Sequence, residues 1–271
     1  MPPSAYFVGS AVFHYLGPSF AVLLFARVEP LGVAWLRIAS AALIFAAWRR
    51  PWRFLRGRLL LSWGVVLAVM NCCFYLAIDR LPLGTVAAIE FLPVVALAAL
   101  GARTVRNGLA LALAVPGVWL LTDVRLVAEP LGVLLAFANA ALFAGYIVLG
   151  HRVARQGPAG GIDGLAASML VAAVLVTPIG GRAAAAAFTD PVALAAGAGV
   201  GITSSVIPYV FDQLAMARLA RASYALMVSL LPATATVIGV VVLAQVPSPA
   251  EAAGVALVVA GVALHRSPGG A

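Results

Sequence analysis

The stretch LPLGTVAAIEFLPVVALAALGA, residues 81–102, decides the fold of this chain. It runs for 22 residues with one charged side chain, Glu90, near its middle. A helix that crosses a bilayer needs about 20 mostly apolar residues. An ionisable group inside such a helix is expensive in lipid, so it usually serves a function. The stretch therefore predicts a membrane-spanning helix with a functional carboxylate.

The rest of the chain has the same character. Apolar residues make up 64% of its 271 residues and charged residues only 10%, whereas about a quarter of a soluble domain is charged. Lipid is the solvent that tolerates this composition. We predict an all-α integral membrane protein with ten transmembrane helices, at residues 4–26, 30–48, 59–78, 81–102, 107–122, 129–150, 163–182, 190–211, 222–244 and 249–265. The first stretch has no basic segment before it, so we expect a mature helix rather than a signal peptide.

Arginine carries all the positive charge of the chain, which has a formal net charge of +8 and no lysine. Twelve arginines fall after the even-numbered predicted helices or in the C-terminal tail, and four fall after the odd-numbered ones. The positive-inside rule then places both termini in the cytoplasm. Because the arginines are dispersed between apolar runs, we expect no nucleic-acid partner, whose signature is a clustered basic stripe.

The chain also resembles itself. Placing Pro93 on Pro232 aligns the fourth predicted helix with the ninth, and placing Gly117 on Gly261 aligns the fifth with the tenth. The repeat unit is therefore five helices, and an odd number of helices turns the second copy upside down.

We predict two inverted five-helix repeats, residues 1–122 and 129–271, in a single membrane domain around a central cavity. Inverted repeats with a binding site near the midplane are the architecture of secondary transporters. A duplication in a purely structural membrane protein is the alternative.

Four segments in this order resemble the EamA type of the drug/metabolite transporter superfamily. They are PSFAVLLFARVEPLGVAWLRIASAALIF (18–45), TVAAIEFLPVVALAAL (85–100), ALFAGYIVLGHRV (141–153) and AEAAGVALVVAGVALH (250–265). The IEFLP motif is similar to that of bacterial amino-acid exporters, both the threonine/homoserine and the aromatic types. The resemblance implies a ten-helix basket whose helices 1, 3, 4, 6, 8 and 9 surround the cavity. It also implies export of amino acids or similar small metabolites across the bacterial inner membrane.

Polar side chains inside the predicted spans are the candidates for lining a substrate cavity. These are His14, Asn71, Tyr75, Glu90, Asn139, Tyr146, Tyr224 and Ser229. Glu90 would attract a substrate ammonium group or exchange a proton, or else form a buried ion pair with Arg37. The amides and phenols would line the site, or else only cross-link helices. Asp212, at the end of the eighth span, is expected at the membrane interface near Arg218 and Arg221.

Prolines inside the spans are candidate hinges, because a proline leaves a backbone carbonyl without its helical donor. They are Pro18, Pro93, Pro208 and Pro232, and simple helix kinks are the alternative. Gly254 and Gly261 give the tenth helix a smooth face, as in a scaffold or a dimer surface, so the oligomeric state stays open.

The sequence shows no metal-binding cluster, no phosphate loop and no nucleophile beside a base. We therefore expect no catalytic residue, no metal, no cofactor and no enzymatic activity. The adjacent Cys72 and Cys73 are interpreted as packing residues. The function we expect is a secondary transporter in contact with lipid, moving a small molecule such as an amino acid, with proton coupling open. A multidrug or other metabolite exporter is the first alternative, and an intramembrane enzyme is the second.

Overall fold

The computed structural model describes residues 3–54, 57–90, 92, 104–126, 129–155, 158–217 and 231–264. Every regular element in these ranges is a helix, which confirms the predicted all-helical class. The elements are α1 (Pro3–Leu24), α2 (Pro30–Arg49), η1 (Pro51–Phe54), α3 (Arg58–Ile78), α5 (Val105–Leu126), α6 (Pro130–Ala154), α7 (Pro158–Ala183), η2 (Ala185–Thr189), α8 (Pro191–Gly201), η3 (Ile202–Val206), α9 (Ile207–Met216), α11 (Leu231–Leu243) and α12 (Pro249–Leu264). Residues 83–90 are also helical.

The eighth predicted span is one long helix with a π-helical turn in its middle. α8, η3 and α9 follow one another without a break over residues 191–216, and η3 is the π-helical part. The sequence analysis did not foresee this turn. Such a wide turn disturbs the regular backbone ladder and occurs frequently at functional sites.

The helix starts follow local sequence chemistry. Several helices begin with proline, which suits the first helical position because its missing N–H would have no partner there. Asp190 caps α8 by accepting from the amides of Val192 and Ala193. Ser248 and Glu251 form a reciprocal capping box at the start of α12, with hydrogen bonds of 2.9 and 3.2 Å.

Five helical stretches of the described chain are long and apolar enough to cross a membrane. They are Pro30–Arg49, Arg58–Ile78, Pro130–Ala154, Gly160–Ala183 and Pro191–Ala215. Large apolar side chains point outward from several helices, for example Leu43 (70% exposed), Trp119 (66%) and Val174 (72%). A soluble monomer rarely exposes so much apolar surface, so this surface faces lipid.

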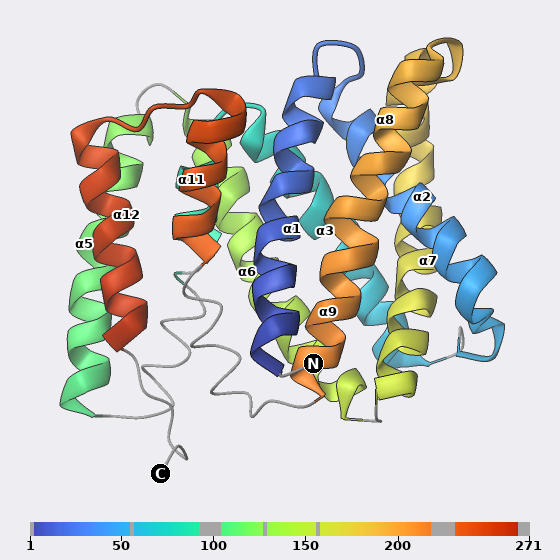
Figure 1. Ribbon diagram of the computed structural model, residues 1–271, viewed down its shortest axis with the longest axis horizontal. Coiled ribbons are helices and arrows are strands. Elements are labelled where there is room, and N and C mark those ends of the chain that lie inside the picture. Colours follow the sequence, from blue (N-terminus) through green and yellow to red (C-terminus); the bar gives the residue numbers. More distant parts are fainter. Residues whose placement is uncertain are drawn as a thin grey trace.

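The helices pack in pairs across the bundle. α5 lies beside α12 at one side of the molecule, α2 and α7 lie at the other side, and α1 and α9 lie between them (Figure 1). α3 packs against both α6 and α7. The lower end of the bundle in Figure 1 is formed by the ends of α2, α6 and α9 and by the starts of α3, α5 and α7. This end carries Arg49, Arg58, Arg106, Arg152 and Arg155, and we call it the arginine-rich end.

Glycine brings α5 and α12 into backbone contact. A Cβ atom at Gly117 would lie 2.8 Å from the carbonyl oxygen of Gly254, and one at Gly261 would lie 2.6 Å from that of Ala110. Both separations are too short for a real side chain. The smooth face predicted for the tenth helix is therefore a packing face against α5 within the same chain.

Candidate functional site

Glu90 is buried at the centre of the bundle and is held by two neutral donors. The Tyr15 hydroxyl of α1 donates to Oε2 at 3.1 Å, and the Asn139 amide of α6 donates to Oε1 at 2.9 Å. Glu90 itself is 3% exposed. Because both donors are uncharged, the carboxylate can exchange them for a charged donor, such as an ammonium group, without breaking an ion pair.

Arg37 of α2 is buried beside Glu90 but bonds to a different part of the bundle. Its Nε donates to Oγ of Ser205 at 2.7 Å, and its Nη2 donates to the carbonyl oxygen of Ser204 at 2.6 Å. Pro208 stands four residues after Ser204 and has no N–H to give to that carbonyl. The proline and the π-helical turn therefore create an acceptor inside the membrane, and the guanidinium occupies it.

Aromatic rings surround the Arg37 guanidinium. Its Cζ lies 5.5 Å from the centre of the Tyr75 ring and 5.7 Å from that of Tyr209. The Tyr209 hydroxyl also accepts from Nη2 at 3.2 Å. Cation–π contacts stabilise a buried arginine without neutralising its charge. Arg37 thus stays available to an anion.

Both charged groups line one small cavity. Its walls are formed by His14, Arg37, Met70, Asn71, Phe74, Glu90, Asn139 and Tyr209. The volume open to the centre of a water-sized sphere is about 10 Å³, which is near the minimum for one water molecule. The space between these described residues is therefore smaller than an amino acid.

The structure brings together four of the predicted cavity residues, His14, Asn71, Glu90 and Asn139. Tyr75 lies next to them beneath Arg37. Tyr146 lies outside this cavity lining and donates to Oδ2 of Asp212 at 3.2 Å. The predicted residues Tyr224, Ser229 and Pro93 lie outside the described residues.

Two candidate hinges have specific surroundings. The Pro208 carbonyl accepts from Oγ of Ser10 at 3.2 Å, and the Pro232 carbonyl accepts from Oγ1 of Thr236 at 2.9 Å. Pro18 lies inside α1 next to Gly17, where a Cβ would collide with Ser204 of η3. The hinge role itself remains a prediction.

The ion pair considered between Glu90 and Arg37 is absent from the described residues. The sequence analysis also missed Tyr15, Ser204, Ser205 and Tyr209 as parts of the site. An arginine inside a span indicates a functional site by itself. Arg37 was considered only as a partner of Glu90, so its own place in the site was not predicted.

Asp212 lies one turn before the end of α9 at the arginine-rich end, and its predicted neighbours Arg218 and Arg221 lie outside the described residues, so its place at the membrane interface stays a prediction. Asp212 is 3% exposed, and Oδ1 accepts from Oγ of Ser10 at 2.5 Å while Oδ2 accepts from the Tyr146 hydroxyl. Gln213, next in sequence, is fully buried. The α9 face that carries these residues packs against α1, α6 and α7, which the sequence pattern alone did not reveal.

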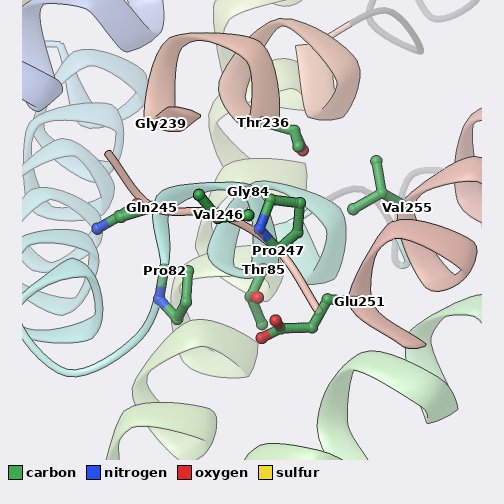
Figure 2. A pocket seen from close by; sticks show the side chains of 10 residues that line it. All are labelled: Pro82, Gly84, Thr85, Thr236, Gly239, Gln245, Val246, Pro247, Glu251 and Val255. Atoms are coloured by element: carbon green, nitrogen blue, oxygen red, sulfur yellow. The ribbon is translucent and has the colours of Figure 1, made fainter. Parts of the chain in front are cut away.

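A larger cavity of about 190 Å³ lies near the end of the bundle opposite the arginine-rich end. Figure 2 shows that its lining comes from residues 82–85, the end of α11, the loop after it and the start of α12. Thr85, Gln245 and Glu251 are among its polar residues. Leu83 donates its amide to Oε1 of Gln245 at 3.1 Å, which ties the loop to the rest of the wall.

Comparisons with known proteins identify the family of this chain. The EamA-like transporter family pattern matches residues 130–266. The chain is 36% identical over 244 residues to the threonine/homoserine exporter RhtA of Escherichia coli (strain K12), covering 87% of this chain and 81% of that protein. RhtA of Salmonella typhimurium (strain SL1344) is 35% identical over 238 residues, covering 84% and 79%.

A solved crystal structure has the same fold, with a TM-score of 0.62 over 96% of each chain at 20% sequence identity. The sequence similarity, the all-helical structure and the apolar outer surface together identify the family of the chain. This chain is a multi-pass membrane protein that belongs to the EamA-like transporter family.

Proposed function

We propose that the protein exports a small amino acid, of the size of threonine or homoserine, by alternating access across the bacterial inner membrane. The observation that carries the proposal is the central cavity, where a buried carboxylate and a buried guanidinium face the same space without bonding to each other. An amino acid is a zwitterion with one ammonium and one carboxylate group. The cavity offers a group of opposite charge to each.

The roles follow from donor and acceptor chemistry. Glu90 accepts from the substrate ammonium in place of Tyr15 and Asn139, and Arg37 donates to the substrate carboxylate. Oδ1 of Asn139, beside Glu90, has no hydrogen-bond partner among the described residues. Buried polar groups are nearly always hydrogen-bonded, so this atom is a candidate for a contact with cargo.

Relatives support the class of cargo. The proteins of Escherichia coli and Salmonella typhimurium are named as threonine/homoserine exporters, and both carry cargo with an α-amino and an α-carboxylate group. A multidrug exporter would favour a larger and more aromatic pocket than this polar cavity. The named relatives are exporters, which makes an enzyme the less favoured alternative.

Reciprocal contacts support the inverted repeat on which alternating access depends. In the register that places Gly117 on Gly261, Ala110 falls on Gly254. Exchanging the two halves therefore turns the contact between Gly117 and Gly254 into the contact between Gly261 and Ala110, and the reverse. The family pattern, over residues 130–266, also has nearly the bounds of the proposed second half.

The arginine distribution supports the proposed orientation, with the arginine-rich end and both termini in the cytoplasm. Arg49 bonds to Asp163 at 2.6 Å at this end, and Arg106 bonds to the Leu264 carbonyl at 2.6 Å. These contacts tie α2 to α7 and α5 to α12. Among the described residues, this end carries more arginines than the opposite end, which is the distribution that the proposed cytoplasmic side requires.

Uptake into liposomes tests the proposal. Purified protein is reconstituted and offered labelled threonine, homoserine, an aromatic amino acid, a nucleoside and a cationic dye. We expect movement of threonine and homoserine, and its loss in Glu90→Gln, which keeps the shape but removes the charge. Movement of the dye or nucleoside without any amino acid would reject the proposal.

Proton coupling is tested in the same liposomes by imposing a pH gradient. If Glu90 exchanges a proton for cargo, the gradient drives threonine uptake in the wild type. Equal flux with and without the gradient, together with retained flux in Glu90→Gln, would eliminate proton antiport through Glu90.

A further inference from the structure

A second buried polar layer lies between the central cavity and the arginine-rich end. Tyr209 lines the central cavity, and Asp212 and Gln213 follow it by about one turn along α9, toward that end. Trp63 of α3 and Tyr146 of α6 belong to the same layer, because their ring centres lie 5.8 Å apart and Tyr146 donates to Asp212. We call these residues, with Ser10 of α1, the inner layer.

We propose that the inner layer is a second amino-acid binding site, which cargo occupies on the cytoplasmic side before it reaches the central cavity. Asp212 binds the ammonium group, and Gln213 and Trp63 bind the carboxylate. This inference rests on the proposed function and its orientation, and it adds a site that the central cavity does not require.

Asp212 is equipped to exchange its donors. In this structure Oδ1 accepts from Oγ of Ser10 at 2.5 Å and Oδ2 accepts from the Tyr146 hydroxyl at 3.2 Å. These hydroxyls come from α1 and α6, so they hold α9 against both helices. A substrate ammonium has three donors and a positive charge, and can replace both hydroxyls when the helices separate.

The side chains of Gln213 and Trp63 carry buried polar atoms that have no hydrogen-bond partner among the described residues. Gln213 is fully buried, and neither its Nε2 nor its Oε1 has a hydrogen-bond partner among the described residues. Nε1 of Trp63, also fully buried, likewise lacks one. Leaving a buried donor or acceptor unpaired is unfavourable, so these groups are candidates for contacts with a ligand.

The two unsatisfied side chains face the same place. A Cβ atom at Gly150 would lie 3.1 Å from Cζ2 of Trp63 and 3.3 Å from Nε2 of Gln213. Both are therefore close to the bare backbone of α6 at this glycine. The indole N–H and the amide N–H are the type of donors that a carboxylate accepts.

The inner layer and the central cavity share four helices, and α2 and residues 83–90 add Arg37 and Glu90 to the cavity. α1, α3, α6 and α9 contribute Ser10, Trp63, Tyr146 and Asp212 to the inner layer. They contribute His14, Asn71, Asn139 and Tyr209 to the central cavity. Cargo released from the inner layer thus reaches the cavity by moving along this set of helices by one to two turns, roughly 5–12 Å.

Transport kinetics measured separately from each face test the inference. Inverted membrane vesicles present the cytoplasmic face, right-side-out vesicles present the outer face, and labelled threonine is the probe for both. We expect Asp212→Asn to raise the KM at the cytoplasmic face about tenfold or more, because a charge-assisted hydrogen bond is lost. The KM at the outer face should change less than about twofold, because the central cavity is intact.

Asp163→Asn is the matched control. Asp163 lies at the same end of the bundle, is only partly exposed and bonds to Arg49 at 2.6 Å. Its replacement removes the same charge outside the inner layer, and the KM at both faces should stay as in the wild type.

Gln213→Leu keeps the test decisive if Asp212→Asn does not fold. If Gln213 were only structural, replacing its unpartnered amide with an apolar side chain of similar size would be neutral or stabilising. A binding role instead raises the KM at the cytoplasmic face. Equal changes at both faces in either variant, or no change in the variants that fold, would overturn the inference. A wild type that moves no amino acid would instead reject the proposed function.

Discussion

The α5–α12 pair and the central polar cluster hold the protein together in opposite ways. Between α5 and α12 the backbone itself is the contact surface, since Gly117 and Gly261 leave no space for a side chain. In the central cluster, polar side chains from α1, α2, α6, η3 and α9 reach across the bundle to one another. The first contact is fixed by shape, and the second by hydrogen bonds that a ligand can replace.

This difference teaches which part of the bundle can move. Close small-residue packing has a steep energy minimum, because any displacement either separates the surfaces or causes a clash. Hydrogen bonds to neutral groups exchange at little net loss when a new partner arrives. We infer that α5 and α12 form a scaffold and that the polar helices rearrange during transport. Two predictions test the comparison directly, and a third adds an exposed ion pair outside both regions as a reference.

The largest effect is expected for Arg37→Gln. The variant removes the guanidinium that holds Ser204 and Ser205 and that we propose as the partner of the cargo carboxylate. Truncating one member of a buried charged network costs about 2–5 kcal/mol, so the initial rate of threonine transport should fall about 30-fold or more. Arg49→Gln is the control, because Arg49 bonds to Asp163 at the end of the bundle and should leave the rate nearly unchanged. Comparable losses in both variants would contradict a special role for the central arginine.

A smaller effect, on stability rather than on transport, is expected for Gly117→Leu and Gly261→Leu. Each side chain would meet backbone atoms of the neighbouring helix, and overpacking costs about 1–3 kcal/mol. Because the two contacts are reciprocal, both variants should lower the melting temperature in detergent by similar amounts.

Gly108→Leu is the control for this pair, since a Cβ at Gly108 meets no atom within 4 Å. We expect its melting temperature to match the wild type within a small margin. If only one of the two interface variants lost stability, the proposed symmetry between α5 and α12 would be wrong.

The smallest effect is expected at Asp190, outside the spans. The hydrogen bond from Arg27 at 2.8 Å, together with those from the amides of Ala193 and Val192, holds the pKa of the Asp190 carboxyl below its ordinary value of 3.8. A lowered pKa means that the carboxylate stabilises the fold above pH 3.8, and that this contribution is lost as the pH falls through the lowered pKa.

Asp190→Asn keeps a capping oxygen but loses this titration. Its melting temperature should therefore fall less than that of the wild type when the pH is lowered from about 6 to about 3. Asp79→Asn, which removes another partly exposed carboxylate, one that contacts Arg80 at 3.4 Å, is the control. A wild type and an Asp190→Asn variant with the same pH profile would show that the exposed pair contributes nothing measurable.

The sequence by itself determined that the chain resides in lipid, that its fold is all-helical and which residues form much of the central site. Long apolar runs have one stable outcome in lipid, where each backbone group must be satisfied within its own helix. Ionisable and amide groups inside these runs identify cavity residues, because they are too expensive to face lipid. This reasoning found His14, Asn71, Glu90 and Asn139, which the structure places around one cavity.

Only the tertiary structure decided which polar groups meet. Arg37 bonds to Ser204 and Ser205, 167 and 168 residues away, rather than to Glu90. Asp212 is buried against Ser10 and Tyr146, partners that its place near Arg218 in the sequence did not indicate. Periodicity gives the side of a helix on which a residue lies, but not the neighbour or the depth it meets. Those depend on how the helices cross and on the π-helical turn that shifts the register of α9, and both result from packing the whole bundle at once.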